Sequence, residues 1–207
     1  MKVICAIHGI RSYGEWIDRF FDYIKNDPRY KKDEPLIAYK YGFLLATKSI
    51  NPFIKFWKIK ALMRKLRKIK KTYPEADLNI ISHSFGTELS YRAIKHSGED
   101  GKPPIIVDKL ILIASIIQIH EDFNETLRAN KIKELHNYCS HEDEVCRINP
   151  FGHSGYKGFI PLDDRKFYEK PYSDLEVYNH QVEILEHCDY FKGDKYFKEW
   201  SDIIYKD

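Results

Sequence analysis

The sequence predicts an α/β fold in which a mostly parallel central sheet of about six strands is flanked by helices in three layers. Two observations carry this prediction. Short apolar runs rich in β-branched residues recur along the 207 residues, and helical patterns separate most of them. The composition, 43% hydrophobic and 31% charged, is typical of a globular protein with a proper core. No repeat or linker interrupts the alternation, so we predict a single domain over residues 1–207.

Six runs have the length and composition of buried parallel strands bounded by turn residues. In chain order they are Val3–Ile7, Leu36–Tyr41, Leu78–Ser82, Lys109–Ala114, Glu134–Cys139 and Val177–Val182. Because strands joined by helices pair in parallel through right-handed crossovers, we expect these runs to form one sheet.

Apolar residues at helical spacing predict the covering layers. The expected helices are Trp16–Lys25, Phe56–Lys71, Gly86–His96, Asp122–Asn130 and Tyr196–Tyr205. The segment Ser115–Lys133 has room for little more than one helix, so we expect no large cap domain there. The segment Arg147–Asp174 is rich in Gly, Pro and aromatic residues and has no period. A loop of that length is usually functional.

Residues with chemical potential follow several of the predicted strands. In an open parallel sheet, a ligand binds outside the carboxyl ends of the strands. The residues at these ends are His8-Gly9-Ile10 after the first strand, Ser82-His83-Ser84-Phe85-Gly86 at the third, Asp143 after the fifth and His187 after the sixth. A serine, an acid and a histidine therefore follow strand ends in that order.

These motifs resemble those of the α/β-hydrolase superfamily over nearly the whole chain. The run SHSFGT is similar to the nucleophile elbow, and HGI resembles the oxyanion-loop signature. The runs NYCSHEDEV and EHCDYF resemble the turns that carry the acid and the histidine in small lipase-like members. The resemblance implies an α/β-hydrolase fold and a serine hydrolase, carboxylesterase-like or lipase-like. It would cleave a small-molecule or lipid acyl ester, or a thioester, through an acyl-enzyme intermediate.

The resemblance also implies the roles of individual residues. Ser84 would be the nucleophile, His187 the base and Asp143 the acid of a catalytic triad, because a serine hydroxyl is a weak nucleophile without a neighbouring base. The backbone N–H groups of Ile10 and Phe85 would form the oxyanion hole, and His8 and Gly9 would shape its loop. In the elbow, Ser82, His83 and Gly86 surround the nucleophile. Gly86 meets the need for small neighbours, whereas Ser82 stands where the usual pattern has glycine.

Alternatives remain open at this stage. His180 and His153 are rivals to His187 as the base, since they too lie late in the chain, and Glu142 and Glu144 flank Asp143. Because Ser82 departs from the usual elbow pattern, a catalytically degenerate hydrolase that acts as a binding module is one alternative. An acyltransferase that uses the same triad is a further alternative.

The segment from Pro35 to Pro74 contains no acidic residue. The predicted helix Phe56–Lys71 is amphipathic with a basic outer face. One interpretation is that its apolar stripe packs on the sheet and its lysines are solvated. Another is a peripheral contact with an anionic membrane or an acidic partner. No base-reading or stacking motif accompanies the charge, so we expect no nucleic-acid partner.

Several other functional motifs are absent from the sequence. The sequence has no Gly-rich phosphate loop, no HExxH and no metal-ligand cluster at helical spacing, so we expect neither a cofactor nor a metal. Four cysteines without CxxC spacing fit free thiols in a reducing compartment. The start of the chain lacks a signal-peptide pattern, and we therefore expect a cytoplasmic location.

Overall fold

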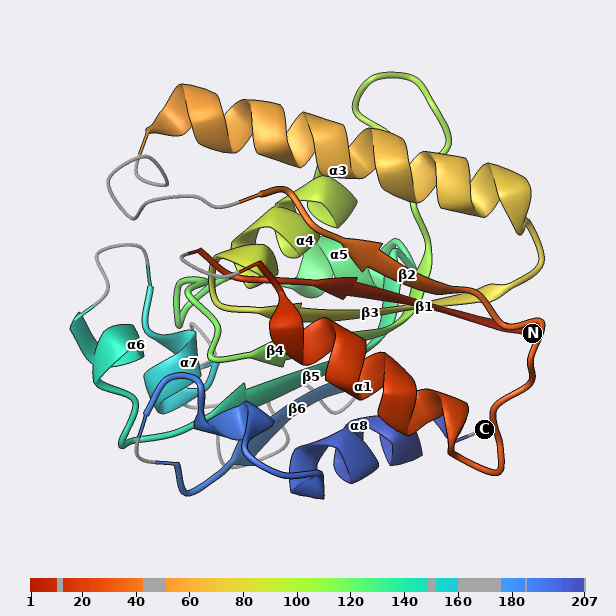
Figure 1. Ribbon diagram of the computed structural model, residues 1–207. Helices are drawn as coiled ribbons and strands as arrows, with labels where there is room; N and C mark the ends of the chain where they lie inside the picture. The colour runs from red at the N-terminus through yellow and green to blue at the C-terminus, as the bar shows by residue number, and fades with distance from the viewer. Residues whose placement is uncertain (11–12, 43–50, 149–151, 160–175, 185, 207) are drawn as a thin grey trace.

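A six-stranded parallel sheet runs through the computed structural model, which describes all residues except 11–12, 43–50, 149–151, 160–175, 185 and 207 (Figure 1). The strand order is β2-β1-β3-β4-β5-β6, and every neighbouring pair is parallel. The strands are β1 (Lys2–Ile7), β2 (Leu36–Tyr39), β3 (Asp77–His83), β4 (Val107–Ile113), β5 (Ile132–Cys139) and β6 (Glu176–Gln181). The predicted sheet is confirmed, because each expected strand is found with its ends shifted by no more than two residues.

The central strands are buried on both faces, which explains why their sequences are apolar without alternation. On β1, Val3, Cys5 and Ile7 face one apolar layer, whereas Ile4 and Ala6 face the other. The strands β3 and β4 alternate in the same way between the two layers. The sheet therefore needs helices on both sides.

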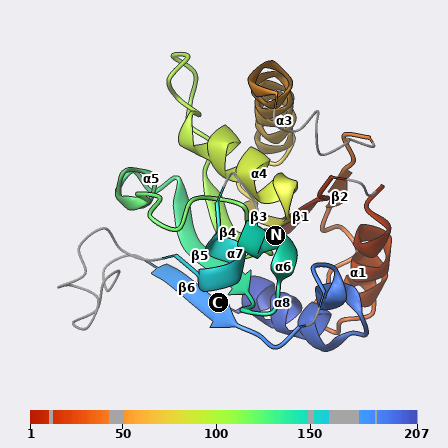
Figure 2. The ribbon, with the colours of Figure 1, turned by 90° about the vertical axis from the view of Figure 1, so that its left-hand side faces the viewer.

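Helices cover the two faces unequally (Figure 1). The helices α3 (Pro52–Thr72), α4 (Phe85–Lys95) and α5 (Asn124–Arg128) supply one apolar layer, and α1 (Glu15–Lys25) and α8 (Lys195–Tyr205) supply the other. Two short helices, α6 (Glu144–Ile148) and α7 (Ser154–Lys157), lie beside the carboxyl ends of the strands (Figure 2). Among the described residues between β4 and β5, α5 is the one helix, so no large cap is built there.

Two helix predictions need correction. The expected helix Asp122–Asn130 is reduced to the five residues of α5, because only Phe123 and Leu127 anchor it to the core and Asn130 turns to φ 51°. Part of the irregular segment Arg147–Asp174 is helical, since it contains the end of α6 and all of α7. Its residues 149–151 and 160–174 lie outside the described part of the chain.

The helix α3 begins four residues before the predicted start at Phe56. The Asn51 side chain caps it by accepting hydrogen bonds from the N–H groups of Phe53 and Ile54, and Pro52 occupies the first turn. Only its C-terminal half is buried, through Leu62, Met63, Leu66 and Ile69. The apolar stripe thus packs most deeply in that half, and Ile54 and Ile59 of the first half are partly buried against the same core. Within the described residues, no helix is both long and apolar enough to cross a membrane.

Candidate active site

Ser84 occupies the sharp turn that joins β3 to α4. Its backbone has φ 52° and ψ −122°, a conformation that costs a non-glycine residue energy and persists only where the surroundings enforce it. Two hydrogen bonds enforce it here. The Ser84 N–H donates to the carbonyl of Ile113 at 2.9 Å, and the Thr87 hydroxyl donates to the carbonyl of Ser84 at 2.6 Å. The side chain of Ser84 is left without a helix-capping bond.

Small residues allow the end of β1 to lie against this turn. A Cβ atom on Gly86 would lie 2.6 Å from the carbonyl oxygen of His8, and one on Gly9 would lie 2.9 Å from Cβ of Ser84. Ser82 is fully buried, and its hydroxyl lies 3.0 Å from that of Ser90 on α4. The serine at the usual glycine position is therefore accommodated by a polar partner in the helix.

Asp143 and His187 lie together, as the sequence predicts. The distance from His187 Nδ1 to Asp143 Oδ2 is 2.8 Å, and Asp143 Oδ1 accepts the backbone N–H of Cys146 at 2.9 Å. Burial raises the pKa of Asp143, but the hydrogen bond and charge of His187 outweigh it and leave that pKa below its usual value. Since Nδ1 faces the carboxylate, Nε2 is the nitrogen left for chemistry. Nε2 is buried and has no hydrogen-bond partner within the described residues.

The rival candidates have other partners in the structure. Nε2 of His180 lies 3.0 Å from Nδ1 of His136, and Nδ1 of His153 lies 2.9 Å from the carbonyl of Cys146. Glu142 and Glu144 are exposed, and Glu144 pairs with Arg147. Of these candidates, only Asp143 and His187 are bonded to each other.

His8 is held in one neutral form by the loop around it. The Tyr41 N–H donates to His8 Nε2 at 3.1 Å, so the proton lies on Nδ1, which is 2.6 Å from the carbonyl of Gly9. The Tyr41 hydroxyl donates to the carbonyl of His8 at 2.9 Å, and the two rings stack. Burial lowers the pKa of His8, which also favours the neutral form.

The two proposed oxyanion donors come from opposite sides of the turn. Phe85 is the first residue of α4, where an N–H group has no acceptor within the helix. Ile10 follows Gly9 on the loop that contacts Ser84. Their role as an oxyanion hole stays a prediction.

His83 contacts the candidate base, which the sequence does not reveal. Its ring lies 4.8 Å from that of His187, and its Nε2 lies 3.3 Å from the His187 carbonyl oxygen. Burial, with a smaller contribution from the charge of His187, lowers the pKa of His83 to about 3. His83 is therefore neutral near pH 7 and adds no charge beside His187.

Cys146 is a second residue that sequence reasoning missed. Its Sγ lies 3.8 Å from His187 Nδ1, and burial and then the charge of Asp143 raise its thiol pKa. The ligand atoms of Asp143, Cys146 and His187 lie within 4.8 Å of one another and could hold a metal ion. The signal for it was the D-x-x-C spacing, which places Asp143 and Cys146 on one turn of chain. The expectation that no metal is needed stays a prediction.

No family model and no curated protein matches this sequence. Solved structures do match: a provisionally assigned hydrolase of the alpha/beta superfamily from Xanthomonas campestris pv. campestris aligns with 99% of this chain and 98% of its own, at TM-score 0.55 and 10% identity. This chain has the α/β-hydrolase fold.

Other solved structures match with a higher TM-score. An uncharacterized protein from Bacillus cereus aligns with 99% of this chain at TM-score 0.64 and 17% identity, and the chain spans 59% of that protein's length. Carboxyl esterase 2 from Tuber melanosporum aligns with 99% of this chain and 76% of its own, at TM-score 0.60 and 10% identity. At these identities the likeness establishes the fold, and the reaction has to be argued from the site.

Proposed function

We propose that this protein is a serine hydrolase that cleaves a carboxylic ester or thioester through a Ser84-His187-Asp143 triad. The observation that carries the proposal is the buried pair of Asp143 and His187, bonded at 2.8 Å through Nδ1, with Nε2 left unpaired within the described residues. The strained backbone of Ser84 adds to it, because such strain clusters at active sites. The esterase among the similar structures makes ester substrates the first to test.

In the proposed reaction, Ser84 Oγ attacks the acyl carbonyl while His187 Nε2 takes the hydroxyl proton. Asp143 holds the ring in the required tautomer and stabilises the imidazolium that forms. The N–H groups of Ile10 and Phe85 donate to the oxyanion. Nε2 then gives its proton to the departing alcohol or thiol. A water molecule, deprotonated by the same nitrogen, cleaves the acyl-enzyme, and the proton returns to Ser84 as the acid leaves.

Ser84 Oγ and His187 Nε2 are not hydrogen-bonded to each other in this structure, since Nε2 has no partner among the described residues. Catalytic hydrogen bonds are often long without substrate and tighten only when it binds. The Asp143–His187 pair already orients the ring, so the proposal requires that Ser84 Oγ and Nε2 come within hydrogen-bond reach when substrate binds.

Covalent labelling with a fluorophosphonate tests the proposal without knowledge of the natural substrate. We expect one label on the wild-type protein, mapped by mass spectrometry of peptides to Ser84, and none on Ser84→Ala or His187→Ala. His153→Ala is a matched control, because it removes a late histidine whose ring bonds a backbone carbonyl instead of Asp143. A folded wild type that takes no label would contradict the proposal and favour a binding module.

A further inference from the structure

The N-terminal half of α3 presents three large aromatic side chains to solvent. Phe53, Phe56 and Trp57 are 75%, 50% and 62% exposed, and no residue of α3 before Leu62 is buried. We call these three residues the aromatic face. Exposed aromatic residues gathered at one end of a helix mark an interaction surface, because packing among the described residues does not explain them.

The charge of α3 indicates which kind of partner such a surface would bind. The helix Pro52–Thr72 contains no acidic residue. Exposed cations at Arg64, Lys65 and Lys68 continue along it from the aromatic face. The ammonium of Lys60 lies 5.6 Å from the centre of the Phe56 ring. Aromatic side chains followed by a row of cations suit the boundary between anionic headgroups and acyl chains.

The aromatic face lies on the side of the molecule that holds the candidate active site. The first turns of α3 lie at the same side of the sheet as α6 and α7, where the strands have their carboxyl ends (Figures 1 and 2). A protein that rests on a surface through this end of α3 therefore turns the carboxyl edge of its sheet toward that surface.

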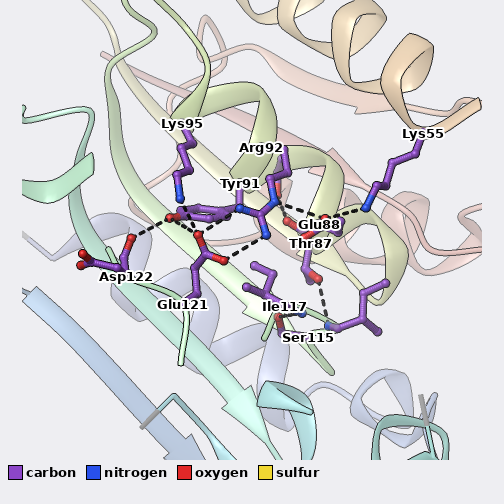
Figure 3. A network of polar contacts seen from close by, with 12 residues as sticks. Lys55, Thr87, Glu88, Tyr91, Arg92, Lys95, Ser115, Ile117, Glu121 and Asp122 are labelled. Atoms are coloured by element: carbon purple, nitrogen blue, oxygen red, sulfur yellow. Dashed lines mark hydrogen bonds and ion pairs between the residues drawn. The ribbon is translucent and has the colours of Figure 1, made fainter. Parts of the chain in front are cut away.

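Two polar contacts connect this half of α3 to the elements around Ser84. Lys55 Nζ lies 3.1 Å from Glu88 Oε1, and Glu88 belongs to α4, the helix that begins directly after Ser84 (Figure 3). Lys58 Nζ donates to the carbonyl of Tyr41 at 2.8 Å, and Tyr41 is the residue that holds His8. Arg92 bonds Glu88 and Glu121, which extends the network across α4 (Figure 3).

A pocket of about 510 Å³ opens between α3 and α4 beside the aromatic face. On the α3 side, Phe56, Ile59 and Met63 supply apolar lining, and Lys55 and Lys60 supply cations. The side formed by α4 and the turn after it contributes two carboxylates. Lys55 and Arg92 neutralise Glu88, and Glu99 lies 2.7 Å from His96 Nδ1. An apolar wall beside cations has the chemistry to receive part of an anionic lipid.

We propose that the N-terminal half of α3 docks this protein on an anionic phospholipid surface. The aromatic face enters the headgroup region, and Lys60, Arg64 and Lys65 contact the lipid phosphates. Docking brings the candidate site to acyl esters held in a lipid assembly, and this last step rests on the proposed function. The docking itself does not depend on catalysis.

Binding to vesicles tests the proposal with the full chain. We expect co-sedimentation with vesicles of phosphatidylglycerol and phosphatidylcholine, weakened by high salt, and little binding to phosphatidylcholine alone. The triple variant Phe53→Ser, Phe56→Ser, Trp57→Ser should bind on the order of tenfold more weakly. The double variant Lys60→Gln, Arg64→Gln should lose about fivefold per charge.

The double variant Lys195→Gln, Lys198→Gln is the matched control, because it removes two exposed cations from α8 on the other side of the sheet. It should bind like the wild type, and all variants should keep the wild-type thermal midpoint. Equal binding to neutral and anionic vesicles would overturn the proposal. So would a loss in the control that matches the loss in the α3 charge variant.

Two control measurements distinguish lipid docking from polyanion binding and from catalysis. Tight binding to a DNA duplex that survives the aromatic replacements would show a simple polyanion site and overturn lipid docking. Labelling of Ser84 by a fluorophosphonate, measured without vesicles, tests the proposed function alone. Label without vesicle binding would refute the docking and support the proposed hydrolase. Vesicle binding without label would support the docking and contradict the proposed hydrolase.

Discussion

At the scale of single residues, the candidate site depends on which nitrogen of each histidine is engaged. His187 offers Nδ1 to Asp143 and keeps Nε2 unpaired within the described residues. Both nitrogens of His8 are engaged, Nδ1 by the carbonyl of Gly9 and Nε2 by the N–H of Tyr41. His83 is held neutral by burial. Of these three histidines, only His187 has the bonding that a general base needs.

Asp143→Asn tests this distinction. The asparagine amide can donate to Nδ1, and the ring proton would then lie on Nε2, the nitrogen that must accept the proton of Ser84. We expect turnover of a soluble ester to fall by about 10³- to 10⁴-fold with little change in stability. Glu144→Gln, which alters an exposed neighbour, should keep wild-type turnover. Equal effects of the two substitutions on the kinetics would show that Asp143 does not act on His187.

Sequence reasoning found the acid-histidine pair because both residues follow strand ends, and parallel strands bring their ends to one edge. It could not find Cys146 or Tyr41. Cys146 contributes through its backbone N–H and through burial, and Tyr41 approaches His8 from the end of a different strand. The D-x-x-C spacing is the one trace of the first contact in the sequence, and the second contact leaves no pattern in a single sequence. The catalytic role of Ser84, Asp143 and His187 stays a prediction.

At the scale of elements, the two halves of the helix α3 differ in how deeply their side chains are buried. From Leu62 onward its apolar residues are fully buried. Before that residue the helix is held by the Asn51 cap, by contacts from Lys55 and Lys58, and by the partly buried Ile54 and Ile59. The amphipathic pattern from residue 56 to 71 predicted one continuous stripe. A sequence pattern cannot show where the underlying sheet ends. The aromatic residues at the start of α3 were therefore compatible with the core as well as with a surface.

Leu66→Ala and Trp57→Ala should separate the two halves of α3. Leu66 is fully buried, so its truncation leaves a cavity and should cost about 2–5 kcal/mol of unfolding free energy. Trp57 is 62% exposed, and its truncation should change that free energy by no more than about 0.5 kcal/mol. Urea unfolding monitored by far-UV circular dichroism measures both. A large loss of stability in Trp57→Ala would mean that the first half of α3 packs more closely than described.

The elements with continuous apolar runs were the ones predicted well. The inner strands β1, β3 and β4 place side chains in both apolar layers, and burial on two faces favours a largely apolar sequence. The short helices α6 and α7 were missed because each has only one turn or slightly more, too short to display a helical period. They are stabilised by their neighbours, as when the Gly155 N–H donates to the carbonyl of Ser115.

At the scale of the whole molecule, buried neutral histidines make stability depend on pH. Burial lowers the pKa of both His83 and His136 to about 3. The charge of His180 adds to the effect on His136, whose Nε2 lies 3.1 Å from a Glu134 carboxylate oxygen. An unfolded histidine has a pKa of about 6.5. Between these values the unfolded chain binds protons that the folded chain does not.

Stability should therefore be complete above about pH 6.5 and fall as the pH decreases toward about 3, by about 1.4 kcal/mol per pH unit for each such histidine. Urea unfolding at a series of pH values measures the slope. His136→Asn should flatten the curve, and His120→Asn, which changes an exposed histidine, should leave it as in the wild type. A slope that is the same in all three proteins would exclude His136 as a source of the acid sensitivity.

The strand order has a consequence for the growing chain on the ribosome. Lys2 at the start of β1 pairs with Asp77 of β3. The edge of β1 that faces β3 therefore stays unpaired until the third strand has been synthesised. Ser84 follows almost immediately, whereas Asp143 comes after β5 and His187 after β6. A nascent chain that ends between Ser84 and His187 therefore contains the serine turn without this histidine. Under the proposed mechanism, such a chain lacks the base that would activate its serine.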